Sequence, residues 1–472
     1  MTPSFSAPRA ALIAILVVSA VRIVVAARYP LTPDETYYWV WSKHLAYGYT
    51  DHPPLVAWLI ALGSAFGNSS LAVRLPFILC EAVAAYAAGR AAVVLSGSEA
   101  AGTAGTLTVL FIPQGRLAVG EALPDGPYLA SWALALWFSA MLSRRASWRA
   151  AVLLGLALGA AILSRFFGWA LVGGIIFYSL LPTRRAIWPA GLWLSLLIAA
   201  ALYIPFIIWN ASHEWSNFAF TFANRQPIHG FSAQRIAVIT SLRLISYALL
   251  LWIVGYFTII RPRYALLAWT ALPFPTLVAL LSFFQTTESY YILGPLISLC
   301  TAIGIAYARQ AAARRRGWLL LSLIPAAYTI LAAMFVALPE SAQAWALQTT
   351  SGALKGPFFS QAFAFAPLSA DVKRLSGGAT ILTDRLEIAS ELTYHGVAAS
   401  IVGSAPQVPQ WRSWYGNELP PRTLLVTFDP LAAQRSAVVS TSCARIRAGP
   451  VLRYRFAGAE TVPFYTTWCM TR

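Results

Sequence analysis

The chain contains repeated apolar runs of about twenty residues, and these runs restrict its fold more than any other feature. A helix of that length matches the hydrocarbon layer of a bilayer, which is about 30 Å thick. The mean hydropathy is +0.64, and 58% of the 472 residues are hydrophobic whereas only 11% are charged. These values are typical of a polytopic α-helical membrane protein and not of a soluble globule.

Hydropathy predicts a transmembrane domain over residues 1–338 with about 11 spanning helices. The first run is interpreted as a retained helix and not a signal peptide, because Arg22 interrupts it and a weak cleavage site follows. The fifth and sixth spans are close enough to be one broken element. The predicted spans are 10–28, 71–95, 100–115, 126–142, 149–165, 167–182, 187–209, 236–260, 264–283, 291–308 and 318–338.

The net charge of +17 reflects topology, because the basic residues are dispersed in short loops and not gathered into a nucleic-acid-binding face. A cytoplasmic amino terminus satisfies the positive-inside rule. It places these arginines inside: Arg9, Arg90, Arg144, Arg145, Arg149, Arg184, Arg185, Arg261, Arg263, Arg309 and Arg314 to Arg316. It places these acids outside: Asp34, Glu35, Asp51, Glu121, Asp125, Glu214 and Glu288.

The pattern changes after residue 338 to short β-like runs, "GATILTD" and "RTLLVTF", with one helical stretch, "RLEIASELTYHG". We therefore predict a small outward-facing α/β domain over 339–472. Cys443 and Cys469 lie in this domain, where an oxidising compartment favours a disulfide, although two unpaired thiols remain an alternative.

Polar and aromatic residues crowd the first outward loop, 29–70, which contains "LTPDETYYWVWSKHLAYGYTDHPP". Thr32 as N-cap, Pro33 as first helical residue and Glu35 three residues after the cap predict a helix start with a capping box. The box is a sufficient structural reason for Glu35. It does not need Asp34, and a short acid at the edge of a cavity is suited to accept a proton.

The helix that follows places Tyr38, Trp41 and Leu45 on one face. Such a face suits a helix lying along the membrane surface with its rings at headgroup depth. A second short helix is predicted over 55–66, before the chain re-enters the bilayer. The loop is thus expected to contain interfacial helices.

"PDETYYWVWSKHLAYGYTDHPPLVAWL" resembles the first outward loop of bacterial membrane glycosyltransferases of the GT-C fold, the group containing protein O-mannosyltransferases and lipid A aminoarabinose transferases. The resemblance continues in "LPDGPYLASWALAL", "GLALGAAILSRF", "WNASHEWSNFAF" and "TDRLEIASELTYHG", and so covers nearly the whole chain. It implies a polyprenyl-phosphate-dependent glycosyltransferase of the bacterial inner membrane. The active site and C-terminal domain would face the periplasm.

The resemblance implies transfer of a sugar, with inversion, from a polyprenyl-phosphate donor to a hydroxyl of lipopolysaccharide, lipid A, another glycolipid or an envelope glycan. Asp34 matches the first-loop catalytic acid and would act as general base. Asp125 in "LPDGP" matches a second acid that orients the donor sugar or Asp34; an N-cap is its structural alternative. A protein acceptor is a second possibility.

A lipid-phosphate leaving group needs cations that stabilise its charge. Arg165 matches a basic position of the family, with snorkelling to the headgroups as the alternative. His52 stands where the aminoarabinose transferases commonly have lysine, and its charge is conditional near neutral pH. The predicted substrate-binding residues are Glu35, Tyr38, His52, Arg116, Arg165, Arg225, Tyr290 and Tyr291.

A metal site built from Glu35, His44, Asp51 and His52 is not favoured, because their spacing matches no tetrahedral signature, and no cofactor is expected to be required. A lipid-linked-sugar flippase is the alternative function from another class. Its support is three charged residues inside spans, Arg22, Glu81 and Arg243, but internal repeats are not evident.

Overall fold

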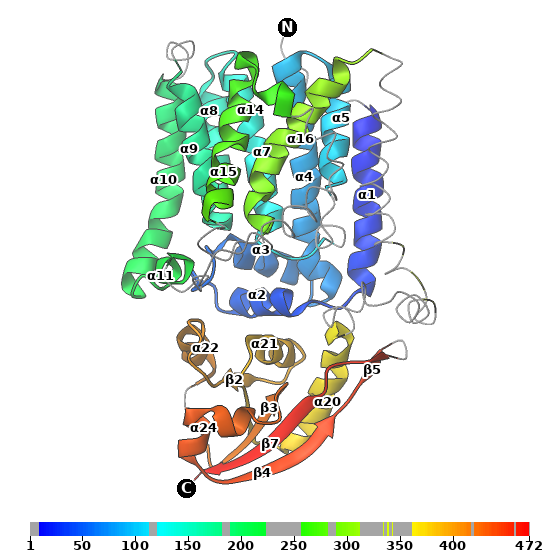
Figure 1. Ribbon diagram of the computed structural model, residues 1–472, viewed down its shortest axis with the longest axis vertical. Helices are drawn as coiled ribbons and strands as arrows, with labels where there is room; N and C mark the ends of the chain where they lie inside the picture. The colour runs from blue at the N-terminus through cyan, green and yellow to red at the C-terminus, as the bar shows by residue number, and fades with distance from the viewer. Residues whose placement is uncertain are drawn as a thin grey trace.

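The computed structural model describes residues 9–112, 120–181, 189–222, 256–281, 289–311, 361–416, 420–456 and 459–471, with single positions at 334, 338 and 342. It has two parts, a helical bundle and a C-terminal domain built on a sheet (Figure 1). Two helices of the first loop lie across the end of the bundle, between these parts. The first helix of the bundle begins at the opposite end.

The bundle is built from long apolar helices. Among the described residues, four helices are long and apolar enough to cross a membrane: Arg9–Arg28, Ser70–Ser96, Ala190–Ser212 and Tyr290–Ala308. The bundle helices are α1 (Arg9–Arg28), α4 (Ser70–Ser96), α5 (Glu99–Leu110), α7 (Asp125–Leu142), α8 (Trp148–Ser164), α9 (Gly168–Ser179), α10 (Pro189–Ser212), α14 (Ala265–Ala271), α15 (Pro273–Leu281) and α16 (Leu293–Ala308).

Most predicted spans coincide with one of these helices to within a few residues. Phe166 separates two helices, α8 and α9, so this region is not a single span. The predicted span 264–283 is divided into α14 and α15 at Pro273, whose ring cannot supply the N–H that a continuous helix needs. Spans 236–260 and 318–338 fall largely outside the described residues, and the count of eleven stays a prediction.

The interior of the bundle contains an ion pair between two of the charged residues that supported a transport function. Arg22 of α1 lies 3.0 Å from Glu81 of α4, and both side chains are buried. Arg22 also donates to the carbonyl oxygen of Leu110. Two of the three intramembrane charges are therefore partners in helix packing, as is usual for such residues. Arg243 lies outside the described residues.

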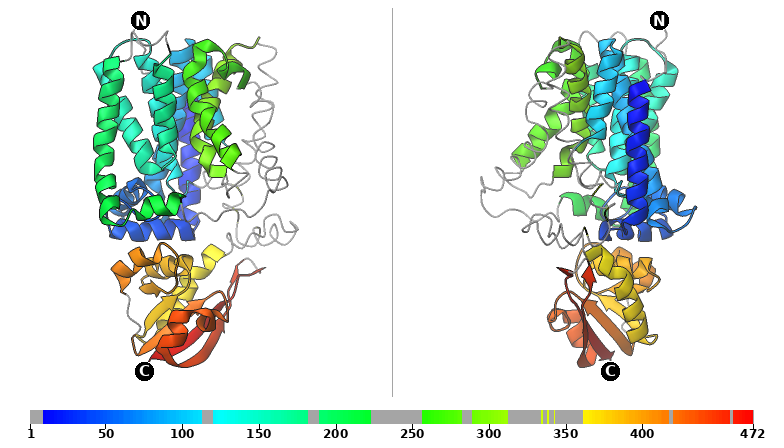
Figure 2. Two further views of the ribbon diagram at one scale, coloured as in Figure 1. Left: turned by 60° about the vertical axis from the view of Figure 1, so that its left-hand side comes forward. Right: turned by 90° about the vertical axis from the view of Figure 1, so that its right-hand side faces the viewer.

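The two helices of the first loop are α2 (Pro33–Lys43) and α3 (Leu55–Ser64). The predicted capping box is present at the start of α2. The expectation of rings at headgroup depth is wrong, because the C-terminal domain covers α2 on the side away from the bundle (Figures 1 and 2). Trp41 is 0% exposed and Tyr38 8%, whereas Leu45 lies beyond the helix and is 59% exposed.

The C-terminal domain contains a five-stranded mixed sheet in the order β2-β1-β3-β7-β4. β1 is parallel to β2 and β3, while β7 is antiparallel to β3 and β4. The strands are β1 (Thr380–Thr383), β2 (Ala399–Ile401), β3 (Arg422–Thr427), β4 (Cys443–Leu452) and β7 (Phe464–Thr471), with a separate hairpin of β5 (Arg455–Phe456) and β6 (Ala459–Glu460).

Helices connect and cover these strands, as the predicted α/β character requires: α20 (Phe365–Ser376), α21 (Leu386–Tyr394), α22 (Val408–Tyr415), α23 (Ala432–Arg435) and α24 (Ala437–Ser442). The two quoted β-like runs form β1 and β3, and the quoted helical stretch forms α21. The central strands are buried almost throughout, which agrees with their continuous apolar sequences. The boundary predicted at 338 falls in a region with few described residues.

Direct contacts join the C-terminal domain to α2 and the loop after it. The Thr36 and Ser390 hydroxyls are 3.1 Å apart, and the side-chain oxygen of Gln410 accepts from both the N–H and the hydroxyl of Thr50. The ring of Trp39 also meets that of Tyr394 edge to face, with centroids 5.0 Å apart. The domain therefore forms one wall around α2.

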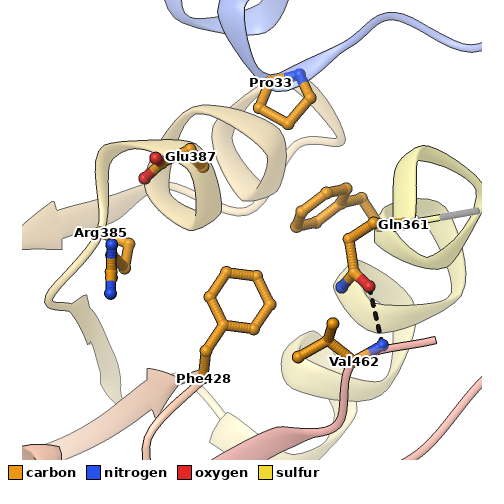
Figure 3. Close-up of a pocket in the computed structure, with 7 residues that line it drawn as sticks. Pro33, Gln361, Arg385, Glu387, Phe428 and Val462 are labelled. Carbon is orange, nitrogen blue, oxygen red and sulfur yellow. Dashed lines mark hydrogen bonds between the residues drawn. The ribbon is translucent and has the colours of Figure 1, made fainter. Parts of the chain in front are cut away.

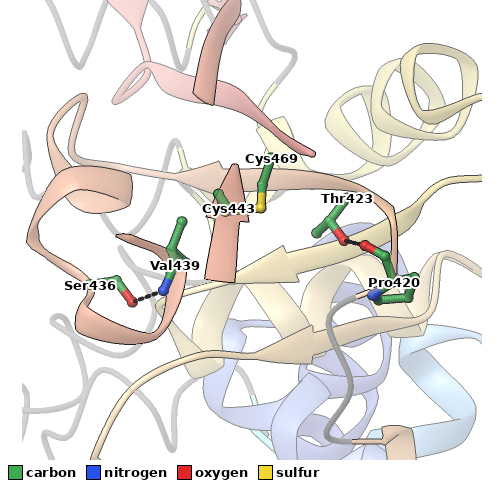
Figure 4. The surroundings of a disulfide bond; sticks show 6 residues. All are labelled: Pro420, Thr423, Ser436, Val439, Cys443 and Cys469. Atoms are coloured by element: carbon green, nitrogen blue, oxygen red, sulfur yellow. Dashed lines mark hydrogen bonds between the residues drawn. A yellow bond between two sulfur atoms is a disulfide. The ribbon is translucent and has the colours of Figure 1, made fainter. Parts of the chain in front are cut away.

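Cys443 and Cys469 form a disulfide between β4 and β7, with Cα atoms 5.4 Å apart (Figure 4). The predicted pairing is confirmed in this geometry. Cys80 and Cys300 are free thiols. The bond closes a loop with a sequence separation of 26 residues, so it restricts the unfolded chain.

We expect the double substitution Cys443→Ser and Cys469→Ser to lower the free energy of unfolding of the C-terminal domain by about 3.5 kcal/mol, the loop-closure value for this separation. Proteolysis of the purified protein at increasing urea concentrations measures the change. Cys80→Ser is the matched control and should leave the midpoint unchanged. Equal midpoints for the double variant and this control would contradict the prediction.

Candidate active site

Asp34 lies in the first turn of α2, where the bundle, the first loop and the C-terminal domain meet. Its side chain is partly exposed. An acid in this position is favoured by the positive end of the helix dipole. Asp34 is thus held near the surface of the site by a helix whose other residues are mostly buried.

Glu35, the next residue, points into the protein and is 0% exposed. Arg74 of α4 binds it through two nitrogens at 2.7 and 2.6 Å, and the N–H groups of Thr32 and Ala122 donate to it at 2.9 and 2.8 Å. Burial would raise the pKa of Glu35, but the Arg74 charge and these hydrogen bonds hold it below its ordinary value. The structure gives Glu35 an internal structural role in place of the predicted substrate contact.

Tyr38 lies one turn after Asp34 on the same face of α2. Its ring centroid is 5.8 Å from that of His52. Burial and the charge of Asp34 raise the pKa of Tyr38 well above its usual range, while the opposing charge of Arg165 lowers it; Asp51 and Tyr290 also act on it. Tyr38 therefore keeps its proton at neutral pH, and its ring lies close to His52, another predicted site residue.

Asp125 and Arg165 form a buried ion pair at 2.8 Å. Asp125 is the first residue of α7, and its side chain binds the guanidinium, so the N-cap alternative does not hold. Arg165 follows the end of α8 and is 5% exposed, which excludes snorkelling into the headgroups. Its guanidinium carbon lies 4.6 Å from the ring centroid of Tyr290. The pair thus connects three parts of the bundle.

This ion pair retains hydrogen-bonding capacity. Oδ1 of Asp125 and Nε of Arg165 are buried and have no hydrogen-bond partner within the described part of the chain. A buried polar atom without a partner is costly, and such atoms are commonly satisfied by water or a ligand. The pair can therefore offer one acceptor and one charged donor to a bound substrate.

Asp51 also lies near the candidate site. The sequence did not predict it as a substrate-binding residue and considered it only for a metal site that was not favoured. Burial raises the pKa of Asp51 to about 7, against hydrogen bonds from Gln407 and Tyr37 that lower it, and Asp34 raises it further. The amide nitrogen of Gln407 lies 3.3 Å from Oδ2, and Oδ1 is buried with no partner in the described residues. The sequence feature that could have identified Asp51 as a site residue is its position directly before His52, a predicted substrate-binding residue.

The remaining predicted residues are distributed unevenly. The rings of Tyr290 and Tyr291 lie 5.0 Å apart, and Tyr291 also packs 4.5 Å from Phe167 and is 5% exposed. Tyr290 thus lies beside the ion pair, and Tyr291 in the packing behind it. Arg116 and Arg225 lie outside the described residues, and their proposed roles stay predictions.

The residues considered for a metal site do not gather. His44 stacks on Trp414 at 4.7 Å and Glu35 is taken up by Arg74. Where the structure describes the chain, three or more His, Cys, Asp or Glu side chains do not come together in a metal-binding group.

Comparisons with known proteins give one family model, one curated relative and several solved structures. The model "Dolichyl-phosphate-mannose-protein mannosyltransferase" matches residues 51–209. The lipid A galacturonosyltransferase RgtD of Rhizobium johnstonii is 32% identical over 135 residues. That alignment spans only 28% of this chain and 28% of the relative.

The structural matches extend over almost the whole chain. ArnT from Cupriavidus metallidurans, bound to undecaprenyl phosphate, superposes with a TM-score of 0.65 at 16% identity, covering 97% of each chain. The oligosaccharyltransferase of Archaeoglobus fulgidus, in complex with zinc and sulfate, gives 0.54 at 10% identity, covering 97% of this chain and 72% of the other. The chain therefore has the fold of ArnT, and residues 51–209 within it are similar to the mannosyltransferase family model.

Proposed function

We propose that this protein transfers a sugar from a polyprenyl-phosphate carrier to a hydroxyl group of a lipid A-like acceptor. The observation that carries the proposal is the buried Arg165–Asp125 pair beside Tyr290, which has a donor and an acceptor without a partner in the described residues. The charges of both Asp34 and Arg165 act on the pKa of Tyr38, one turn after Asp34 in α2. Asp34 is partly exposed, and the Arg165 guanidinium has one donor without a partner where the structure describes the chain. A displacement at a lipid-phosphate sugar needs these two functions, a base and a cation.

Asp34 acts as the general base. The acceptor oxygen attacks the anomeric carbon, its proton passes to the carboxylate of Asp34, and the bond from the anomeric carbon to the phosphate oxygen breaks. The electron pair of that bond leaves with the lipid phosphate. A single displacement of this kind inverts the anomeric configuration.

Arg165 and Tyr38 stabilise the negative charge that develops on the leaving phosphate. The Nε donor of Arg165 has no partner in the described residues, and the Tyr38 hydroxyl remains protonated because burial and Asp34 raise its pKa. Donors fixed in a buried site stabilise developing charge strongly. In this proposal His52 is an auxiliary donor beside Tyr38, and a divalent metal is not required.

Asp125 has a different role from Asp34. Because it binds Arg165 at 2.8 Å, it orients the guanidinium toward the phosphate. Its second oxygen is the acceptor available to a hydroxyl of the donor sugar. Asp125 therefore positions both the cation and the donor.

The curated relative and the family model support different acceptors. The curated relative is named for lipid A, which supports a glycolipid acceptor, whereas the family model is named for protein mannosylation, which supports a protein hydroxyl. The ArnT structure bound to undecaprenyl phosphate supports the polyprenyl-phosphate donor and does not distinguish between these acceptors. We favour the lipid because the relative named for lipid A is 32% identical over 135 residues. The protein acceptor is the second candidate.

We further propose that the site faces the periplasm of the inner membrane. Arg9, Arg144, Arg149 and Arg309 lie at helix ends far from the C-terminal domain, which agrees with the positive-inside rule. Asp34, Asp51 and Asp125 lie at the end next to that domain, and the disulfide suits an oxidising compartment. A flippase loses support because Arg22 and Glu81 pair within the bundle.

Replacing Asp34 with Asn removes the base while keeping the shape of the side chain. We expect turnover of a polyprenyl-phosphate sugar with a lipid A acceptor in nanodiscs to fall about 10²- to 10⁴-fold, the usual contribution of general base catalysis. Asp429→Asn, at an exposed position of the C-terminal domain, is the matched control. Unchanged transfer by Asp34→Asn in a folded protein would remove Asp34 from the reaction.

A double-mutant cycle tests the joint action of Arg165 and Asp125. Arg165→Lys and Asp125→Asn should each lower kcat, by about tenfold or more, because the first replaces the guanidinium by an ammonium group and the second removes the carboxylate that orients the guanidinium. The double variant should lose little beyond the more severe single variant, since contacting residues are not additive. Fully additive losses in log kcat would show that the two residues act separately.

The raised pKa of Asp51 makes the stability of the fold depend on pH. Its pKa is raised in the folded protein from 3.8 to about 7, so its proton stabilises the fold below about pH 4, and this stabilisation is lost as the pH rises through about 7. The melting temperature of Asp51→Asn should therefore depend less on pH across this interval than that of the parent protein. Asp429→Asn should retain the parental slope, and an unchanged slope in Asp51→Asn would contradict the assignment.

A further inference from the structure

A pocket of about 190 Å³ lies between the start of α2 and the C-terminal domain (Figure 3). It is separate from the ion pair of Asp125 and Arg165, and none of the residues assigned to the reaction lines it. The lining residues come from several parts of the chain: Pro33, Gln361, Phe365, Arg385, Glu387, Phe428 and Val462.

The pocket is mostly apolar inside and charged at its edge. Phe365 is fully buried and Phe428 half-buried, whereas Arg385, Glu387 and Val462 are exposed. The two edge charges have opposite signs, so they do not favour an ionic ligand of one sign. The interior therefore selects its ligand mainly by apolar contact.

Gln361 provides a polar group inside this pocket. Its side chain is 7% exposed, and its oxygen accepts from the N–H of Val462 at 2.9 Å. Its amide nitrogen is buried and has no acceptor among the described residues. Since an unpaired buried donor is costly, a ligand that brings one acceptor oxygen would be favoured here.

These properties distinguish between ligand classes. A sugar carries many hydroxyl groups, and burying them without partners is unfavourable. A fatty acyl chain buries only methylene groups, each contributing about 0.8 kcal/mol, and its ester or amide carbonyl is a single acceptor. Pockets for whole drug-sized ligands are about 300–1,000 Å³, so this smaller pocket accommodates only part of a chain.

The pocket is also close to the end of a membrane span. The apolar helix α1 ends at Arg28, and Pro33 follows five residues later. The ring of Tyr29, directly after α1, meets Phe363 edge to face at 5.6 Å, two residues from Gln361.

We propose that this pocket binds part of an ester- or amide-linked acyl chain of the lipid acceptor, with the chain carbonyl accepting a hydrogen bond from Gln361. The identification of the lipid as the acceptor rests on the proposed function; the binding of an acyl chain does not. The site would hold the acceptor by its apolar part while a hydroxyl of its headgroup is presented at Asp34, the residue after Pro33.

Photolabelling of the full chain in nanodiscs of phosphatidylethanolamine and phosphatidylglycerol tests the site. The probe is a trace of lipid with an ester-linked palmitoyl chain bearing a diazirine, and mass spectrometry locates the labelled peptides. We expect label on the peptides that contain Phe365 and Phe428. Val462→Trp should fill the pocket and abolish that label, whereas Val451→Trp, at an exposed valine of β4, should not.

Gln361→Leu separates the hydrogen bond from the apolar contact. It should lower labelling by the ester-linked probe about fivefold, the weakening produced by loss of one neutral hydrogen bond, and leave an ether-linked probe unaffected. Equal labelling of the parent protein and Val462→Trp would overturn the acyl site. Equal loss with both probes in Gln361→Leu would overturn the assigned hydrogen bond.

Transfer kinetics test the source of the chain separately. Val462→Trp should raise KM for an acylated acceptor but not for its deacylated form, and an unchanged KM for both would overturn the identification of the lipid as the acceptor. If the parent protein labels in the pocket but transfers no sugar, the acyl site stands and the proposed reaction fails.

Discussion

The buried pair of Glu35 and Arg74 is the interaction on which the candidate site depends most. The Arg74 guanidinium donates to both oxygens of Glu35 and to the carbonyl oxygens of Tyr29 and Pro30. The remaining capacity of Glu35 is used by backbone N–H groups, including that of Ala122. These hydrogen bonds offset the free-energy cost of burying the two charges. It fixes the start of α2 to α4, and so it fixes the direction of Asp34.

A second buried pair, Asp125 and Arg165, differs from the first in how completely its atoms are hydrogen-bonded. The atoms of Glu35 and Arg74 are satisfied, whereas one atom of Asp125 and one of Arg165 have no hydrogen-bond partner among the described residues. Both pairs combine an acid with an arginine from another helix, so residue type does not distinguish them. Atoms without a hydrogen-bond partner among the described residues also occur in the Arg22–Glu81 pair, so this criterion alone is not sufficient. The pair of Asp125 and Arg165 also lies beside Tyr290, a residue of the candidate site.

Local patterns in the sequence predicted the elements that local physics determines. The capping box at Thr32 and Glu35, the long apolar helices and the strands around Ile381 and Leu424 follow from neighbouring residues. The partners of the charged residues did not follow, because Arg165 lies forty positions from Asp125 and Gln407 more than three hundred from Asp51. The resemblance identified Asp34 and Asp125 as important, but only the three-dimensional arrangement assigned Glu35 to the fold and drew attention to Asp51.

The cover that the C-terminal domain forms over α2 has a consequence for domain exchange between related enzymes. Ser390, Gln407 and Gln410 meet the first loop through individual hydrogen bonds to Thr36, Asp51 and Thr50. A chimaera that receives a foreign C-terminal domain would lose these matched contacts and disturb the helix that carries Asp34. The first loop and the C-terminal domain therefore form one module, and the orientation of α2 is retained only if they are moved together.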